Sequence, residues 1–185
     1  DNDIDKLFGR ASGSADGLLM RVFSSTAQNA IRIAVNEARR LKRDQVGTDH
    51  LLVGILSGQD SEAATALEAI GITRSSLRTA IEREFGVGDS TTVEDLPFSK
   101  NAILSFEKAF EAAKSFGAKT IGTDQLLIGI LGLQKVVDRG SLSREDCAGV
   151  TILRSLGVDL AYLRQLVLGK IIAPQESTIK AVEAQ

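Results

Sequence analysis

Residues 46–56 read VGTDHLLVGIL, and the same pattern returns at residues 121–131 as IGTDQLLIGIL. Eight of the eleven positions are identical, and two of the other three exchange Val for Ile. A match of this length indicates an internal duplication, which is typical of folds built from repeated structural units. The two halves of the sequence should therefore share one architecture.

The similarity extends outward from this segment in both directions. Upstream, Phe23 and Ser24 pair with Phe98 and Ser99 at the same separation of 75 positions. Downstream the separation is 86, because Leu77-Arg78 matches Leu163-Arg164, so eleven residues are inserted in the second half, within 132–149. The resulting division is an N-terminal arm (1–21), repeat one (22–86), a connection (87–97), repeat two (98–172) and a C-terminal tail (173–185). Together 22–172 should form one domain, and the arm should be frayed or hold one weak helix.

Apolar residues recur with helical spacing in both halves. The pattern predicts helices over about 26–41, from 48 onward, over about 62–70 and over about 74–85, each with a counterpart in the second half. No stretch alternates as a sheet strand would. The sequence therefore predicts an all-α fold, with two pseudo-symmetric four-helix repeats forming one eight-helix globule.

Side chains at the helix ends support these boundaries. Hydroxyl groups that can cap exposed N–H groups precede several predicted helices, at Ser24 or Ser25, Ser61, Thr73 and Ser99, and Asp159 precedes the last predicted helix. We expect Thr48 and Thr123 to cap the second helix of each repeat in the same way. Gly71 and Gly117 are suited to end helices. Gly54 and Gly129 fall inside helices at a cost of about 1 kcal/mol each relative to Ala, which suggests a close helix crossing.

The composition favours a globular protein that is poor in reactive side chains. Twenty-two basic and 24 acidic side chains leave a net charge of −2, which argues against a dedicated nucleic-acid binder. No apolar run approaches the ~18 residues of a membrane span. A single cysteine, Cys147, cannot form an intramolecular disulfide, which favours a reducing compartment.

Little in the sequence points to catalysis. No Gly-rich loop followed by Lys and Ser or Thr is present, so the chain lacks the phosphate site of an ATPase. The only histidine, His50, is replaced by Gln125 in the copy, so a packing or capping role is expected. No cluster of potential ligands predicts a metal or other cofactor. A small hydrolase that uses Cys147 or His50 is the alternative from another functional class.

Basic residues mark two candidate contact surfaces. The first helix carries four arginines opposed in sequence only by Glu37: Arg32, Arg39, Arg40 and Arg43. They form either a solvated face or a contact for an acidic partner. In the insertion, Arg139 and Arg144 lie among Gly and Ser and suggest a loop that contacts a partner.

The doubled Gly-Thr-Asp-x-Leu-Leu-x-Gly-Ile-Leu block, preceded by Phe-Ser and an Ala-rich helix, resembles the Clp N-terminal repeat family over about 22–170. The resemblance implies a non-catalytic domain that docks substrates, adaptors or other Clp subunits. Two kinds of member remain open, and the eleven-residue insertion and the lack of an ATPase motif make the sequence more similar to the first. One is a ClpT-like accessory subunit of the chloroplast stroma, which loses a transit peptide and docks on the ClpP/ClpR protease core, supporting its assembly and stability and its interaction with a Clp ATPase. The other is the substrate- and adaptor-binding domain of a ClpC-type unfoldase; outside plastids, the chain would be cytoplasmic.

The resemblance also implies one ligand site in each repeat. In bacterial ClpC domains, an acidic residue after the Gly-Thr pair recognises phosphorylated arginine. Asp49 and Asp124 occupy these positions here, where the bacterial pattern has Glu. The simpler explanation is that both carboxylates stabilise the first turn of a helix, where negative charge opposes the positive helix end.

Overall fold

A computed structural model of the chain describes residues 21–58, 61–90, 96–134 and 147–169. The helices are α2 (Ser25–Arg40), α3 (Thr48–Ser57), α4 (Glu62–Ala69), α5 (Arg74–Phe85), α6 (Lys100–Ser115), α7 (Thr123–Leu131) and α9 (Ala148–Ser155), followed by a helical segment at 160–169. Within these residues the only β-type pairing consists of two isolated bridges. The predicted all-α fold is confirmed. Residues 1–20 of the predicted arm, the tail and the central part of the insertion (135–146) lie outside the described residues.

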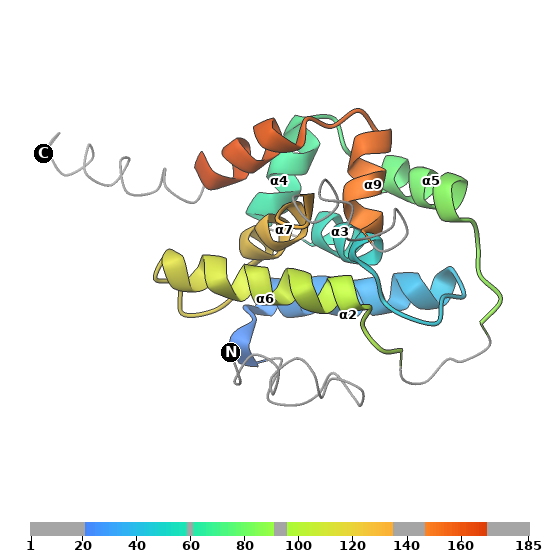
Figure 1. Cartoon of the computed structure of the whole chain (residues 1–185), viewed down its shortest axis with the longest axis horizontal. Coiled ribbons are helices and arrows are strands. Elements are labelled where there is room, and N and C mark those ends of the chain that lie inside the picture. The colour runs from blue at the N-terminus through green and yellow to red at the C-terminus, as the bar shows by residue number, and fades with distance from the viewer. Residues whose placement is uncertain (1–20, 59–60, 91–95, 135–146, 170–185) are drawn as a thin grey trace, which may run out of the picture.

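The helices are arranged in layers, and matching helices of the two repeats lie in the same layer (Figure 1). The long helices α2 and α6 form one layer, α3 and α7 lie at the centre, and α4, α5 and α9 cover the other side. Within each repeat the first helix packs mainly on the second, α2 on α3 and α6 on α7. Because α3 and α7 are surrounded, nearly all their side chains are buried, which explains why their sequences are apolar on every face.

Most of the predicted helix ends are confirmed. The hydroxyl groups of Ser24, Ser61, Thr73 and Ser99 each accept a hydrogen bond from the N–H group three residues on. Asp159 caps the last helical segment, because its Oδ1 accepts from the N–H groups of Ala161 and Tyr162 at 3.0 and 3.1 Å. Each of these bonds satisfies an N–H group that the first turn would otherwise leave unpaired.

The ends of the first helices differ between the repeats. Gly71 and Gly117 have positive φ values of 83° and 67°, as expected for residues that follow a helix. Lys42 takes the position in repeat one that Gly117 takes in repeat two, and its φ is 52°. An L-residue with a side chain is disfavoured in this left-handed conformation, so repeat one carries local strain that repeat two avoids.

Close helix crossings account for the two mid-helix glycines. A Cβ atom built on Gly54 would overlap the carbonyl oxygen of Ala30 in α2. A Cβ atom on Gly129 would overlap the carbonyl oxygen of Ser105 in α6. The same backbone contact is therefore made in both repeats, and the predicted crossing is confirmed.

Short bridges tie the repeats to each other. Phe23 pairs with Ile121, and Val46 pairs with Phe98. The segment that precedes the first helix of each repeat thus lies beside the segment that precedes the second helix of the other. The rings of Phe23 and Phe98 both pack edge-on against Phe106, with centroids 5.5 and 5.2 Å away. The two repeats consequently share one core.

Candidate functional site

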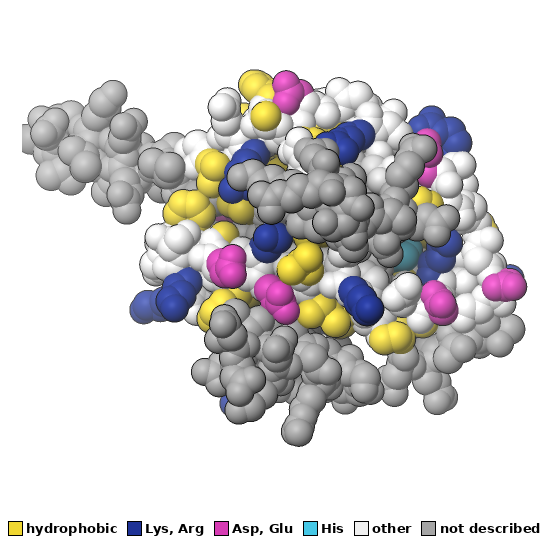
Figure 2. Space-filling view, in the orientation of Figure 1, with side chains coloured by type: hydrophobic (Ala, Val, Ile, Leu, Met, Phe, Trp, Pro, Cys, Tyr) yellow, Lys and Arg dark blue, Asp and Glu magenta, His cyan; other side chains and the backbone are white. Residues whose placement is uncertain are grey.

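A hollow of about 640 Å³ lies where the starts of α3, α6 and α9 meet the end of α5. We call it the helix-start hollow; its lining includes Asp49 and His50 of α3, Lys100 of α6, Ala148 of α9, Glu84 of α5 and Arg43. Part of the only histidine, coloured cyan, is visible among basic and acidic side chains in Figure 2. The hollow therefore combines charges of both signs with N–H groups of helix starts, which favour anionic groups.

The start of α3 differs from the prediction. The residue that precedes the first turn is Gly47, and Thr48 is already inside the helix, so the expected capping by Thr48 is wrong. The His50 side chain performs the related task, because its Nδ1 accepts from the Gly47 N–H group at 2.9 Å. This confirms the capping role expected for His50. The glycine is favoured here because a Cβ atom would meet the Asp49 carboxylate.

Repeat two uses the same arrangement with a different side chain. Gly122 precedes α7, Thr123 lies inside the helix, and the Gln125 Oε1 accepts from the Gly122 N–H group at 2.7 Å. The predicted capping by Thr123 is therefore wrong as well. Histidine and glutamine are equivalent here because both place an acceptor atom within reach of the same N–H group.

The two threonines instead connect the repeats. The Thr48 hydroxyl accepts from the N–H group of Gly149 in α9 at 2.9 Å. The Thr123 hydroxyl accepts from the Ser61 hydroxyl, at the start of α4, at 3.0 Å. In each case the second helix of one repeat binds the start of the third helix of the other. The sequence signal was present in the matched Gly-Thr pairs, but the distant partners could not be read from local spacing.

His50 is held in its neutral form. Burial lowers the pKa of its imidazole, and the nearby Asp49 carboxylate opposes this effect without reversing it. Because Nδ1 accepts a hydrogen bond, the proton of the neutral ring is assigned to Nε2. Among the described residues, Nε2 is buried and has no hydrogen-bond partner. The 3.4 Å contact between Nδ1 and Asp49 Oδ1 is accordingly not an ion pair.

A buried carboxylate organises the basic first helix. Glu37 is 3% exposed, and it accepts hydrogen bonds from Arg40 at 2.8 Å and from Arg78 of α5 at 2.7 Å. Arg40 also reaches Glu82 at 2.9 Å. Burial raises the pKa of the Glu37 carboxyl, but the hydrogen bonds and charges of Arg78 and Arg40 outweigh it, and the net pKa lies below its ordinary value. Glu37 is therefore ionised and links α2 to α5.

This network was missed at the level of the sequence. Glu37 occupies the buried stripe of α2, next to Ala34 and Ala38. A charged residue on an apolar stripe signals a buried ion pair, since burial of an unpaired charge is costly. The sequence alone did not identify Arg78 as the partner.

The predicted basic contact residues have different roles. Arg32 and Arg39 are exposed on α2, and Arg39 also hydrogen-bonds Asn36 at 3.3 Å. Arg40 is engaged with Glu37, and Arg43 donates to the carbonyl oxygens of Phe85 and Gly86 at 3.0 and 2.9 Å. Arg40 and Arg43 thus connect α2 to α5. Arg139 and Arg144 lie outside the described residues.

Comparison with protein families supplies the identification. The Clp repeat (R) N-terminal domain matches residues 22–139, which is more than half of the chain. The chain belongs to this family.

Relatives of this Clp repeat domain include ATP-binding subunits of Clp proteases and Clp chaperones. The ATP-dependent Clp protease ATP-binding subunit ClpA homolog of Cyanidium caldarium is 30% identical over 88% of this chain and 18% of that protein. The chloroplastic chaperone protein ClpC1 of Arabidopsis thaliana is 29% identical over 92% of this chain and 17% of that protein. The chain spans less than a fifth of the length of these relatives.

A solved structure shares the fold. The N-terminal domain of the chaperone ClpD from Arabidopsis thaliana superposes with a TM-score of 0.68 at 22% identity, over 84% of this chain and 98% of that domain. The Hsp104 N-terminal domain from Candida albicans gives a TM-score of 0.61 at 15% identity, over 79% of this chain and 89% of that domain.

The two aspartates that follow the Gly-Thr pairs of this Clp repeat domain have unlike environments. Asp49 is 4% exposed and lies beside His50 in the helix-start hollow. Asp124 is half-buried, and its Oδ1 accepts from the Thr123 hydroxyl at 3.3 Å. An incoming guanidinium group would therefore reach Asp124 more readily than Asp49.

Reactive groups are scarce in the described part of this Clp repeat domain. Cys147 is buried at the start of α9, and no group of three potential metal ligands occurs among the described residues. None of the described helices is long and apolar enough to cross a membrane.

Proposed function

We propose that residues 22–172 form a non-catalytic docking domain that serves a plastid Clp system. The observation that carries the proposal is the contrast between matched internal contacts and unlike surfaces. The close crossing at Gly54 recurs at Gly129. By contrast, the ion pair of Glu37 with Arg40 occurs only in repeat one, because the matching residues of repeat two are Ala112 and Ser115. Relatives named as chloroplastic Clp chaperones support the plastid assignment.

For the partner, we propose the ClpP/ClpR protease core, with the domain acting as an accessory subunit that supports assembly of the core and its interaction with a Clp ATPase. The eleven-residue insertion after α7 supports this role, because it gives repeat two a contact segment that repeat one lacks. The test is affinity capture from plastid stroma with the tagged chain, followed by identification of bound proteins. We expect core subunits among them; their absence would contradict the accessory role.

The alternative is the substrate- or adaptor-binding domain of a ClpC-type unfoldase. The similarity to ClpC1 over 92% of this chain favours it. The same capture experiment separates the two functions, since this alternative predicts retention of an unfolded substrate such as casein or of adaptor proteins in place of core subunits.

The proposed contact surfaces are the basic face of α2 in repeat one and the insertion of repeat two, with Arg139 and Arg144. Arg32 and Arg39 are exposed on α2 and are suited to an acidic partner. Exchange of both for Glu should weaken capture without lowering the unfolding midpoint. Lys114→Glu on exposed α6 is the matched control and should leave capture unchanged.

The family's phosphoarginine sites at Asp49 and Asp124 remain a separate proposal. The greater exposure of Asp124 favours repeat two. Binding of phosphoarginine, followed by calorimetry, should be lost in Asp124→Asn and largely kept in Asp49→Asn. Equal affinity in Asp124→Asn and the unaltered chain would contradict this assignment.

A further inference from the structure

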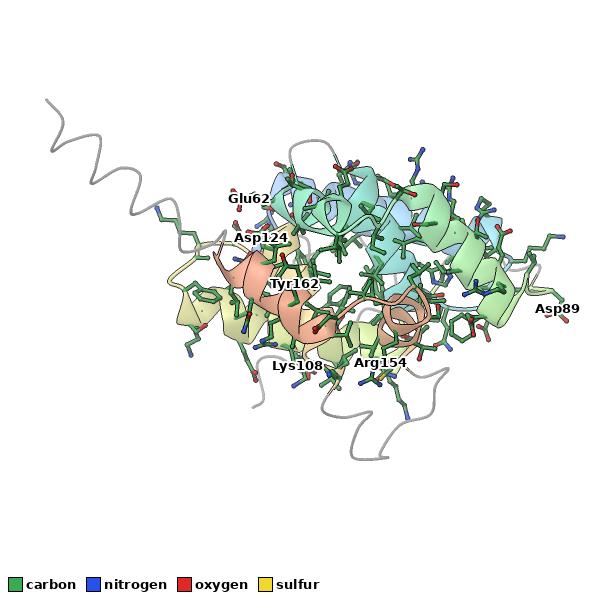
Figure 3. All side chains as sticks on the ribbon, turned by 90° about the horizontal axis from the view of Figure 1, so that it is seen from above. Glu62, Asp89, Lys108, Asp124, Arg154 and Tyr162 are labelled. Atoms are coloured by element: carbon green, nitrogen blue, oxygen red, sulfur yellow. The ribbon has the colours of Figure 1, made fainter. Side chains whose placement is uncertain are left out.

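The duplication places an arginine at the matching position of each repeat, so the surroundings of the two arginines can be compared. Arg78 of α5 and Arg164 of the 160–169 segment occupy matching positions in the repeats. In repeat one, the Arg78 guanidinium binds the Glu37 carboxylate through two hydrogen bonds, of 2.7 and 3.0 Å. Figure 3 shows α5 and the helix that carries Tyr162 on opposite sides of the centre, in keeping with the pseudo-twofold relation.

Repeat two keeps the arginine and loses both acidic side chains of the repeat-one network, Glu37, which binds Arg78, and Glu82, which binds Arg40. The position of Glu37 is taken by Ala112, and that of Glu82 by Leu168. Among the described residues, no carboxylate forms an ion pair with Arg164, and its side chain is exposed. A carboxylate that completes repeat one is thus missing from repeat two.

A hollow occupies the place of the missing side chain. It measures about 490 Å³ and lies between α6, the end of α7 and the 160–169 segment. We call it the repeat-two hollow; Lys108 and Arg164 provide its cationic groups, and Ile128, Leu131, Phe116 and Leu168 provide apolar surface. Among the described residues that line it, Glu111 is the only acidic one, so this described part of the lining carries a net positive charge.

Exposed aromatic surface adjoins the same region. Phe116 is 40% exposed, whereas Leu41, which occupies the matching position in repeat one, is fully buried. An exposed apolar side chain beside a cationic group suits a partner that presents both an apolar and an acidic side chain. The repeat-two hollow has this combination.

We propose that the repeat-two hollow binds a peptide segment of a partner protein, in which a glutamate side chain pairs with Arg164 and a neighbouring leucine-like side chain covers Phe116 and Leu168. The glutamate takes the place that Glu37 takes in repeat one. This inference rests on the proposed docking function and names the chemistry of one partner segment. Repeat one cannot bind such a segment at Arg78, because its own Glu37 already occupies the guanidinium.

The direct test uses a short peptide and the whole chain. The probe is acetyl-Ala-Leu-Glu-Leu-Ala-amide, and the control peptide carries Gln in place of Glu. Binding is followed by NMR through the side-chain Nε–H signal of Arg164, which is assigned by its loss in Arg164→Lys. We expect the Glu peptide to shift this signal, to leave that of Arg78 in place, and to bind about five-fold more tightly than the Gln peptide, as an exposed ion pair of about 1 kcal/mol would give.

The decisive variant is Ala112→Glu, which gives repeat two the carboxylate that repeat one already has. It should shift the Arg164 signal without any peptide, raise the unfolding midpoint, and weaken binding of the Glu peptide about five-fold, to the level of the Gln peptide. Equal affinity for the two peptides, an unmoved Arg164 signal, or full binding by Ala112→Glu would overturn the inference. If the variant still captures Clp subunits while the Glu peptide fails to bind, the docking function stands and this site is refuted. If the unaltered chain captures neither Clp subunits nor the proteins expected of the alternative, the docking function itself fails.

Discussion

Replacement of Gly54 by Ala tests the close crossing of α2 and α3. A methyl group at this position would overlap the carbonyl oxygen of Ala30 and lie 3.3 Å from the N atom of Ala34. Both contacts are with backbone, so no side-chain rotation relieves them. The two helices must therefore move apart, although alanine by itself favours a helix by about 1 kcal/mol over glycine.

The cost of that movement follows from the packing of the crossing. Ala27, Ala30, Ala34 and Ala38 line it and are all fully buried. A separation of about 1 Å forfeits a quarter to a half of each van der Waals contact across such an interface. Overpacking of this kind costs about 1–3 kcal/mol. After the helix-propensity gain of about 1 kcal/mol, we expect a net loss of up to about 2 kcal/mol, which lowers the unfolding midpoint by up to about 8 °C in a domain of this size.

Thermal unfolding followed by circular dichroism measures the effect. The matched control is Gly169→Ala, because Gly169 is also helical and a Cβ atom there meets nothing within 4 Å. The control should keep or slightly raise the midpoint. If Gly54→Ala and Gly169→Ala are equally stable, the backbone contact does not explain the glycine, and the reasoning is refuted.

Three further substitutions test features that differ between the repeats. Lys42→Gly relieves the positive φ of 52° as Gly117 does in the copy, and the denaturation midpoint should rise by the equivalent of about 0.5–1 kcal/mol; no rise would mean that the strain is absent. His50→Gln copies Gln125 and should preserve the fold. Because the pKa of His50 is lowered on folding, the unaltered chain should lose stability as the pH falls below about 6.5, when only the unfolded state takes up the proton, and the variant should show a flatter profile in urea titrations at pH 5–7. Glu37→Gln keeps the shape but removes the charge that two guanidinium groups bind, and the free energy of unfolding should fall by about 1–3 kcal/mol; an unchanged value would show that the network adds no stability.

The fold was largely predictable because its signals are local and occur twice. Ser24, Ser61 and Ser99 cap the predicted helices, and Gly54 and Gly129 mark the predicted crossings. Each of these features depends on a few adjacent residues or on the backbone of one helix. The duplication then supplies an independent check, since the same feature appears at the matching position.

Contacts that join distant parts of the chain were not predictable in this way. Thr48 has the position of a capping residue in the sequence, yet its hydroxyl binds Gly149, 101 residues away. The role of His50 could be inferred because Gln125, at the matching position, also carries a side-chain atom that can accept a hydrogen bond. The partner of Glu37 could not be inferred, because it lies 41 residues away in α5. Spacing along one helix does not reveal which other helix covers it.

The exchanged bridges explain how one duplicated framework can carry two different surfaces. Phe23 pairs with Ile121 and Val46 with Phe98, so each repeat completes the edge of the other. A change in these shared contacts affects both halves and is therefore constrained by the stability of the whole domain. The position of Glu37 and Ala112 lies outside that shared framework, at the edge between the first and last helices of a repeat. A substitution at this position alters the surface of one repeat without changing that of the other. Positions of this kind would let a docking domain with two similar halves acquire two unlike partners.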